Sequence, residues 1–340
     1  MRAYLRVVFA LTAVTAIFLY NYFEYSKKAE KSQQLSHRLT KLADNINNQI
    51  KGIETSVLNL ASATVNAFEN QDSFITRVDK TQYQISDKRL FRINATSSSA
   101  VFSSNIIPID DEFLKTAYLT EAIETHLSQI ELEFSVVGQV YYIHHNSFCR
   151  IFPPFDVISQ NFIEEDFTCC HFYYLADEKH NPEKNAVWID EPYVDGTGRG
   201  WLISCIAPVY RQNQHIGTVG ADLTLELINK NWTLSSNRFP VLLVSDSGQI
   251  IGGHHEAFRI FSFPQLVNHN FLDTIKLNSF LPKHFNLKNS QVKEIREIST
   301  KILAKASFRT VMQTFDKKYL VGSQRLEKAG LILIMMTESP

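Results

Sequence analysis

The chain has 340 residues, which leaves room for two ordinary domains and a long helix. Its formal net charge of −1 provides no basic field for a nucleic-acid partner. Phenylalanine (24) and tyrosine (13) are plentiful and glycine (12) is not, which favours packed, β-rich cores over a disordered chain or a glycine-loop enzyme.

An apolar run near the N-terminus, residues 7–20, extends to residues 3–23 and approaches the roughly 20 residues that a membrane-spanning helix needs. Arg6 can snorkel to the headgroups at one end, and an aromatic belt follows at the other end: Tyr20, Tyr22, Phe23 and Tyr25. A cleaved signal peptide is the alternative, because Arg2 and Arg6 form a charged n-region. No convincing small-residue cleavage site follows, so residues 1–23 are predicted to be an uncleaved transmembrane signal anchor.

A long amphipathic helix is predicted over residues 24–70, with Gly52 as its only breaker. Apolar side chains recur at spacings of three and four: Leu35, Leu39, Leu42, Ile46, Ile50, Ile53, Val57 and Leu60. At about 1.5 Å per residue such a helix is roughly 65 Å long. Its apolar seam can pair with a second copy in a dimer, as heptads do, or lie along the sheets of its own chain, or do both.

The apolar period changes after this helix, and residues 71–230 are predicted to form a first module. Its predicted helices lie at 110–130, 170–177 and 223–229, and its predicted strands at 82–93, 100–102, 134–144, 148–152, 188–193, 200–210 and 216–223. A polar boundary at 232–238 separates it from a second module, residues 231–340. That module has a predicted hairpin at 239–253, helices near 263–268 and 291–305, and strands at 307–314, 318–325 and 330–337. The same order of architecture thus occurs twice.

Two acidic residues, Asp195 and Asp222, occur in segments whose other residues are mostly apolar or aromatic. A buried carboxylate must find a cation or several donors, because an isolated charge is very costly in a low dielectric. With Tyr193 and Trp188 nearby, the pair suggests a pocket for a positively charged ligand group. The alternative is a β-meander whose acids cap turns or face water, since aspartate is common in turns.

Enzyme motifs are missing from the sequence: it has no Walker loop, no GxSxG and no HExxH. Four cysteines are present without a CxxC spacing: Cys149, Cys169, Cys170 and Cys205. Three alternatives are open for these cysteines. Buried free thiols are the most common outcome for cysteines in apolar strands. If the domain lies outside the cytoplasm, a disulfide from Cys149 to Cys169 or Cys170 is favoured over a metal cluster with nearby histidines. We expect no enzyme activity, no cofactor and no metal.

The segment 165–223 resembles the signature of the double Cache family, the extracytoplasmic ligand sensors of bacterial receptors, and a weaker resemblance covers about 24–338. It implies an α+β fold in which a membrane helix and a long helix precede two PAS-like (Cache) modules with antiparallel sheets. It also implies an N-in, C-out topology in the inner membrane, with most of the chain periplasmic. The family continues into a second membrane helix, so a second anchor and the output domain are expected to be absent from this chain.

In the amino-acid-binding branch of that family, an Arg-x-Trp-Tyr motif precedes Tyr-x-Asp and Gly-x-Asp motifs. Its Arg and Trp hold the ligand carboxylate, and its Tyr and two Asp hold the ammonium. Here Cys170 stands at the Arg position and Phe172 at the Trp position, while Tyr173 is kept. The second motif is intact as Tyr193-Val-Asp195, and the third as Gly220-Ala-Asp222. The resemblance therefore implies that the ammonium-binding half is present and the carboxylate-binding half is lost.

This asymmetry predicts that the ligand is an amine or another cation and not a free α-amino acid, because no arginine fork can pair with a carboxylate. Aromatic faces for the cation would come from Phe172, Tyr173, Tyr193 and Trp188. A further tyrosine from the central strand would be Tyr141 or Tyr142. A degenerate pocket, or a protonated His171 in place of the arginine, are the alternatives.

The function expected from these features is that of a homodimeric, extracytoplasmic small-molecule sensing domain of a membrane-anchored signal-transduction receptor. The receptor would be of the histidine kinase, diguanylate cyclase or chemoreceptor type. The alternative is a stand-alone membrane-tethered ligand-binding protein without a signalling output.

Overall fold

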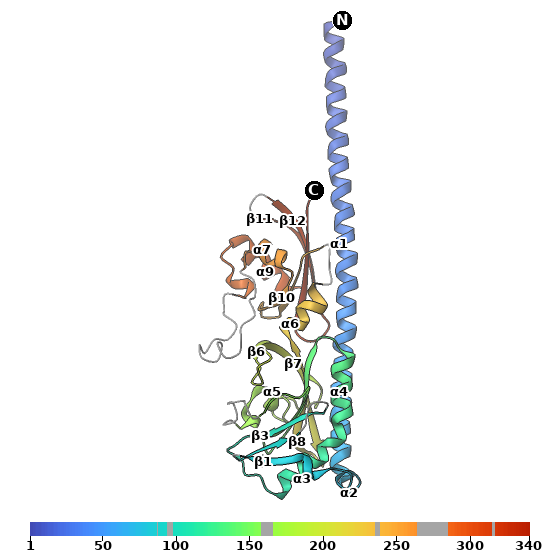
Figure 1. Cartoon of the computed structure of the whole chain (residues 1–340). Coiled ribbons are helices and arrows are strands. Elements are labelled where there is room, and N and C mark those ends of the chain that lie inside the picture. The colour runs from blue at the N-terminus through green and yellow to red at the C-terminus, as the bar shows by residue number, and fades with distance from the viewer. Residues whose placement is uncertain (87, 94–97, 158–165, 235–238, 264–284, 315–316) are drawn as a thin grey trace.

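The computed structural model describes residues 1–340 apart from 87, 94–97, 158–165, 235–238, 264–284 and 315–316. The predicted anchor and the predicted long helix form one continuous helix, α1 (Arg2–Glu69), which runs beside both sheets and extends beyond them at its N-terminal end (Figure 1). Most of the helix predicted near 263–268 lies outside the described residues. Among the helices described, one is long and apolar enough to cross a membrane, and it is α1, near the N-terminus.

The apolar seam of α1 packs on the sheets of its own chain. Most of its predicted residues are almost inaccessible to solvent, namely Leu35, Leu39, Ile46, Ile50, Ile53, Val57 and Leu60, whereas Leu42 is only partly buried. They belong to one core that also contains sheet residues of both modules, such as Ile203 and Leu333. Of the two uses of the seam left open by its spacing, packing within the chain is therefore the one observed, and the homodimer stays a prediction.

The first module is built on an antiparallel six-stranded sheet of order β3-β5-β4-β8-β7-β6. Its strands are β3 (Ala100–Ser103), β4 (Val137–His144), β5 (Phe148–Phe152), β6 (Val187–Val194), β7 (Trp201–Arg211) and β8 (Gln214–Thr224). The strand predicted at 82–93 is a separate hairpin of β1 (Tyr83–Ser86) and β2 (Arg89–Arg92). The described α-helices of this module are α2 (Gln71–Ile75), α3 (Asp111–Leu119), α4 (Glu124–Glu133), α5 (His171–Tyr174) and α6 (Leu225–Ile228).

The two faces of this sheet bury different cores, because successive side chains of a strand point to opposite sides. One face, with Tyr142 and Cys205, packs against α1, α3 and α4. The other face, with Tyr141 and Ile206, packs against the segment that includes α5. We call these the helix face and the site face.

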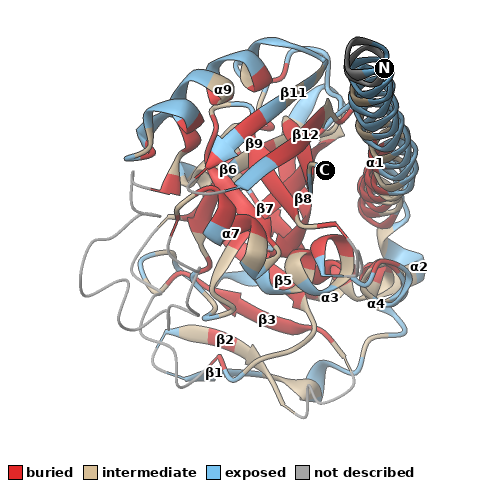
Figure 2. Ribbon diagram, turned by 90° about the horizontal axis from the view of Figure 1, so that it is seen from above, coloured by how far each residue is buried: buried red, intermediate tan, exposed pale blue. Residues whose placement is uncertain are grey.

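The second module has an antiparallel five-stranded sheet of order β10-β9-β13-β12-β11. Its strands are β9 (Val241–Ser245), β10 (Ile250–Gly253), β11 (Ser307–Thr314), β12 (Lys317–Arg325) and β13 (Leu331–Glu338), with described helices α7 (His255–Ile260) and α9 (Lys293–Ala304). Buried residues line the sheets of both modules (Figure 2). The α+β fold class, with two antiparallel modules after a long helix, is confirmed.

Polar residues of α1 join the helix to both modules. The carboxylate of Glu54, 6% exposed, accepts a hydrogen bond from Trp188 Nε1 of the first module at 2.9 Å. It also forms an ion pair with Lys328, in the turn between β12 and β13 of the second module. Glu54 is therefore a contact point of α1 with the two modules at once.

Candidate functional site

Asp195 and Asp222 meet on the site face of the first sheet. Their side chains are buried, 5% and 3% exposed. The side-chain amide of Gln139 bridges them, because its Nε2 donates to Asp195 Oδ1 at 3.1 Å and to Asp222 Oδ2 at 2.6 Å. The interpretation in which the two acids face water is therefore wrong, and the two acids lie together on the site face.

The register of three neighbouring strands assembles this site. Gln139 of β4 and Ser204 of β7 are the cross-strand partners of Asp222 on β8. Ser204 Oγ donates to Asp222 Oδ1 at 2.5 Å, and its hydroxyl also lies 2.6 Å from that of Tyr193 on the edge strand β6. Asp222 thus accepts two hydrogen bonds within the described part of the chain, fewer than the roughly four that a carboxylate has room for.

Asp195 follows β6 and caps its own turn. Its carboxylate accepts hydrogen bonds from the backbone N–H of Thr197 at 3.0 Å and of Arg199 at 2.9 Å, and it also contacts the Thr197 hydroxyl. Gly198 and Gly200 take positive φ in this turn, which glycine does without strain. Together with the hydrogen bond from the Gln139 amide, these contacts use nearly all of the hydrogen-bond acceptor capacity of the Asp195 carboxylate. The turn-capping interpretation therefore holds for Asp195, and the unused acceptor capacity is on Asp222.

Tyr141, and not Tyr142, is the central-strand tyrosine of the site. Its ring lies over Gly220 of the Gly-x-Asp motif, where a Cβ would be 2.3 Å from Tyr141 Cζ, so this position requires glycine. Its buried hydroxyl lies near that of Tyr193 but makes no well-aligned hydrogen bond to any described residue. Tyr142 is buried on the helix face.

The rings of Phe172 and His171 pack beside the ring of Tyr193. The Phe172 ring lies 6.2 Å from that of Tyr193, nearly parallel, and 6.3 Å from that of Tyr141. His171 meets Tyr193 edge-on at 4.2 Å. Burial lowers the pKa of His171, so the ring stays neutral near pH 7 and does not supply the positive charge that would replace an arginine.

The other residues predicted to contact the ligand make their described contacts away from the acid pair. Tyr173 is buried on the site face, but its ring packs on His215 at 5.1 Å, and Cys170 begins α5, where its carbonyl accepts from the Tyr173 N–H. The prediction that Trp188 walls the pocket is wrong. Its indole packs on the helix face and donates a hydrogen bond to Glu54, because Trp188 pairs with Cys205 of β7, which lies on that face.

Burial controls the electrostatics of the site. It raises the pKa of Asp222 from 3.8 to about 7, and the neighbouring charge of Asp195 adds to this, while the bonds from Ser204 and Gln139 oppose it. Burial and the Asp222 charge likewise raise the pKa of Tyr141 and Tyr193, so both hydroxyls keep their protons. Asp222 therefore keeps its proton to a higher pH than an exposed aspartate does.

Arg199 is a resident cation that the sequence motifs did not indicate. Its Nη1 donates to the Gly138 carbonyl at 3.0 Å and its Nη2 to the Pro153 carbonyl at 2.9 Å. Burial lowers its pKa, and the charges of Asp195 and Asp222 oppose that shift. With both acids ionised the site therefore carries about one uncompensated negative charge. Gln139 and Ser204 were also missed, although a glutamine inside an apolar strand is a usable signal.

Metal and disulfide chemistry receive no support from the described residues. They contain no group of three or more His, Cys, Asp and Glu side chains arranged for a metal ion. None of the four cysteines, all of which lie in the described part of the chain, is in a disulfide; Cys149 and Cys205 are buried and Cys169 is exposed. The disulfide from Cys149 to Cys169 or Cys170 is therefore not formed in this structure.

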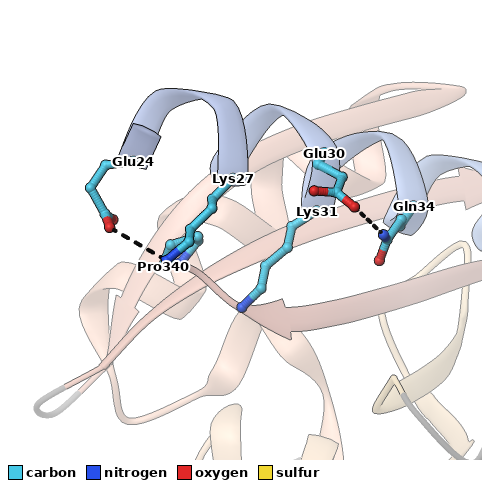
Figure 3. Close-up of a pocket in the computed structure, with 6 residues that line it drawn as sticks. All are labelled: Glu24, Lys27, Glu30, Lys31, Gln34 and Pro340. Atoms are coloured by element: carbon cyan, nitrogen blue, oxygen red, sulfur yellow. Dashed lines mark hydrogen bonds and ion pairs between the residues drawn. The ribbon is translucent and has the colours of Figure 1, made fainter. Parts of the chain in front are cut away.

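A cavity of about 490 Å³ lies away from the acid pair, between the N-terminal half of α1 and the chain end (Figure 3). Its lining is Glu24, Lys27, Glu30, Lys31, Gln34 and Pro340. Lys27 Nζ lies 4.0 Å from Glu24 Oε1, and Gln34 Nε2 donates a hydrogen bond to Glu30 Oε1 at 3.1 Å. This cavity adds no residue to the site in the first module.

Comparison with models of protein families finds no match, and comparison with curated proteins finds none either. Solved structures do match. The ligand-binding domain of the Pseudomonas fluorescens chemoreceptor CtaA in complex with L-serine is 15% identical with a TM-score of 0.54, over 91% of this chain and 98% of that one. That of the Pseudomonas aeruginosa chemoreceptor PctB with L-Arg is 13% identical with a TM-score of 0.50, over 91% and 96%.

The extracellular domain of the putative histidine kinase mmHK1S-Z2 is also similar, at 13% identity and a TM-score of 0.50, over 92% of this chain and 98% of that one. Identities this low establish shared architecture and leave ligand and output unspecified. The chain therefore has the double Cache type of fold, as found in the ligand-binding domains of chemoreceptors and histidine kinases.

Proposed function

We propose that this chain is the extracytoplasmic sensing part of a membrane-anchored receptor, and that its first module binds a small ligand through an ammonium group at Asp195 and Asp222. The observation that carries the proposal is the buried acid pair itself. Two carboxylates share one neutral amide donor, and Asp222 retains acceptor capacity. A buried, under-paired carboxylate favours a cationic partner with several N–H donors.

Membrane attachment in this proposal rests on the N-terminal part of α1. Its large apolar side chains are exposed over residues 8–23, among them Leu11, Phe18 and Phe23. Exposed apolar surface of this extent on a single helix is typical of contact with lipid. We propose one N-terminal pass through the inner membrane, with both modules on the periplasmic side.

An amine is favoured over a free α-amino acid. Cys170 stands where the resemblance would place a carboxylate-binding arginine, and each Nη group of Arg199 donates one hydrogen bond to a backbone carbonyl, which holds the guanidinium in place. A monocation would neutralise the remaining charge of the site, whereas a zwitterion would add a carboxylate without a bidentate partner. The neighbours CtaA and PctB were solved with amino acids, so amino acids are the comparison that the experiment must include.

A matched pair of ligands tests this choice by calorimetry on the full chain in detergent micelles. 3-Methylbutylamine and L-leucine differ only by the α-carboxylate. We expect heat of binding from the amine and a weaker or undetectable signal from the amino acid. Binding of L-leucine with the amine inactive would overturn the ligand class, and an Asp222→Ala variant that binds as well as the wild type would overturn the site.

The receptor assignment has its own test. The two modules can be joined to the membrane and output segments of a chemoreceptor of known response, with the amine as stimulus. A ligand-dependent response supports a sensor, because the ligand must then distinguish two states of the protein. Binding without any response in the chimera would favour the stand-alone tethered binding protein.

A further inference from the structure

The Gln139 side chain lies between the two acids and uses its whole donor capacity on them. It is 2% exposed. A primary amide nitrogen carries two hydrogens, and here one carboxylate oxygen of each acid lies within hydrogen-bond distance of it, at 3.1 and 2.6 Å. The amide oxygen is oriented the other way, 3.1 Å from the Thr197 hydroxyl.

This arrangement has the geometry that a bound ammonium group would require. An alkylammonium also presents N–H donors to two acceptors, and it adds a positive charge that the amide lacks. Charge-assisted hydrogen bonds are roughly twice as strong as neutral ones. An ammonium is therefore the better partner for the acid pair, and the amide is a weaker substitute at the same place.

We propose that the Gln139 amide occupies the ammonium position in the empty protein and leaves it when a ligand binds, so that Gln139 is an internal competitor that sets the affinity of the site. This inference rests on the proposed function, since it assumes that the acid pair binds an amine. It assigns a role to a residue that the sequence motifs do not include.

If Gln139 is an internal competitor, removing its amide should lower the stability of the ligand-free protein and raise its affinity for the amine. Without the amide, the empty protein holds two facing carboxylates that have lost their shared donor, so its free energy rises. The liganded protein loses less, because the ammonium supplies the missing donors. A positioning role for Gln139 predicts that stability and affinity fall together.

Gln139→Met tests the inference, because methionine has a similar volume and no donor. Gln249→Met is the matched control: Gln249 is 7% exposed and lies in the second module. Calorimetry with 3-methylbutylamine and thermal unfolding are measured on the full chain in detergent. We expect Gln139→Met to have a lower Tm without ligand and an affinity at least about tenfold higher, and Gln249→Met to keep the wild-type affinity.

Unchanged or lower affinity in Gln139→Met would overturn the competitor role while leaving the amine site intact. If the wild type binds no amine, the proposed function itself fails, and the two failures are thus distinguishable. Gln139→Asn, whose amide is one methylene shorter and does not span both acids, replaces the methionine variant if that variant does not fold. It is expected to gain affinity too, and a loss in it would equally overturn the inference.

Discussion

Replacing Asp222 with asparagine separates the charge of the site from its shape. Asparagine is nearly isosteric, so Ser204 and Gln139 can remain in place, but no anion is left to pair with the ligand. Removing one partner of a buried charge pair costs about 2–5 kcal/mol of binding free energy. Amine affinity should therefore fall by a factor of roughly thirty to several thousand.

The same substitution should change how stability depends on pH. The pKa of Asp222 is raised to about 7 in the folded protein from 3.8. The folded state therefore holds this proton more tightly than the unfolded state, and the free energy of unfolding of the wild type falls as pH rises from about 4 to about 7. The shift corresponds to about 4 kcal/mol at most. Asp222→Asn lacks this contribution, so its stability relative to the wild type should increase across that window and then level off.

Two measurements check this prediction on the full chain in detergent. Thermal unfolding is followed for the wild type and Asp222→Asn between about pH 4.5 and about pH 8. Calorimetry with 3-methylbutylamine is run over the same range, where wild-type affinity should rise with pH as Asp222 ionises. Asp195→Asn is the contrast: each oxygen of the Asp195 carboxylate accepts a backbone N–H, and the amide nitrogen of asparagine would face one of these donors, so the variant should be less stable at every pH.

Parallel pH profiles of Tm for the wild type and Asp222→Asn would refute the electrostatic argument, because they would mean that this carboxylate does not take up a proton on folding. Undiminished amine binding in Asp222→Asn would refute its role in the site. The two results test different claims: the first tests whether burial raises the pKa of Asp222, and the second tests whether Asp222 binds the ligand.

Three further substitutions test other parts of the structure. Gly220→Ala places a methyl group in the ring of Tyr141 and should destabilise the fold by about 1–3 kcal/mol in urea denaturation, whereas a neutral effect would contradict the stacking. Arg150→Met removes a fully buried guanidinium bonded to five groups and should cost about 3–5 kcal/mol by the same assay; a stabilised variant would show that the network is not needed. Glu54→Leu leaves the Trp188 indole N–H without its acceptor and should cost about 1–3 kcal/mol, and an equal loss in Lys328→Ala would instead assign the effect to the exposed ion pair.

Local pattern in the sequence was sufficient for most of the elements, although the strand predicted at 82–93 is a hairpin. Apolar residues at spacings of three and four require one buried face on a helix, and the seam from Leu35 to Leu60 is buried as that spacing predicts. The strands of the second module after α9 lie within a few residues of the predicted ranges. These features depend on residues that are close to one another in the sequence, so they can be predicted from the sequence alone.

Alternation along a strand could have corrected one error. Tyr193 and Asp195 are two residues apart and share the site face, whereas Trp188 precedes Ile189, which lies on the site face, and so belongs to the helix face. The choice between Tyr141 and Tyr142 was different, because alternation shows only that they oppose each other. The face that receives the acids depends on how β4 pairs with β8, and that pairing places Tyr141 over Gly220.

The sequence by itself determined a long helix, two antiparallel modules and two acids in apolar surroundings, because periodicity and composition act over short stretches of chain. Only the tertiary structure decided that one amide joins those acids and that Arg199 lies near them. Gln139 is 56 residues from Asp195 and 83 from Asp222. Contacts at such separations are created by strand register and packing, since no local preference of the chain carries information about which distant side chain will complete a buried charge.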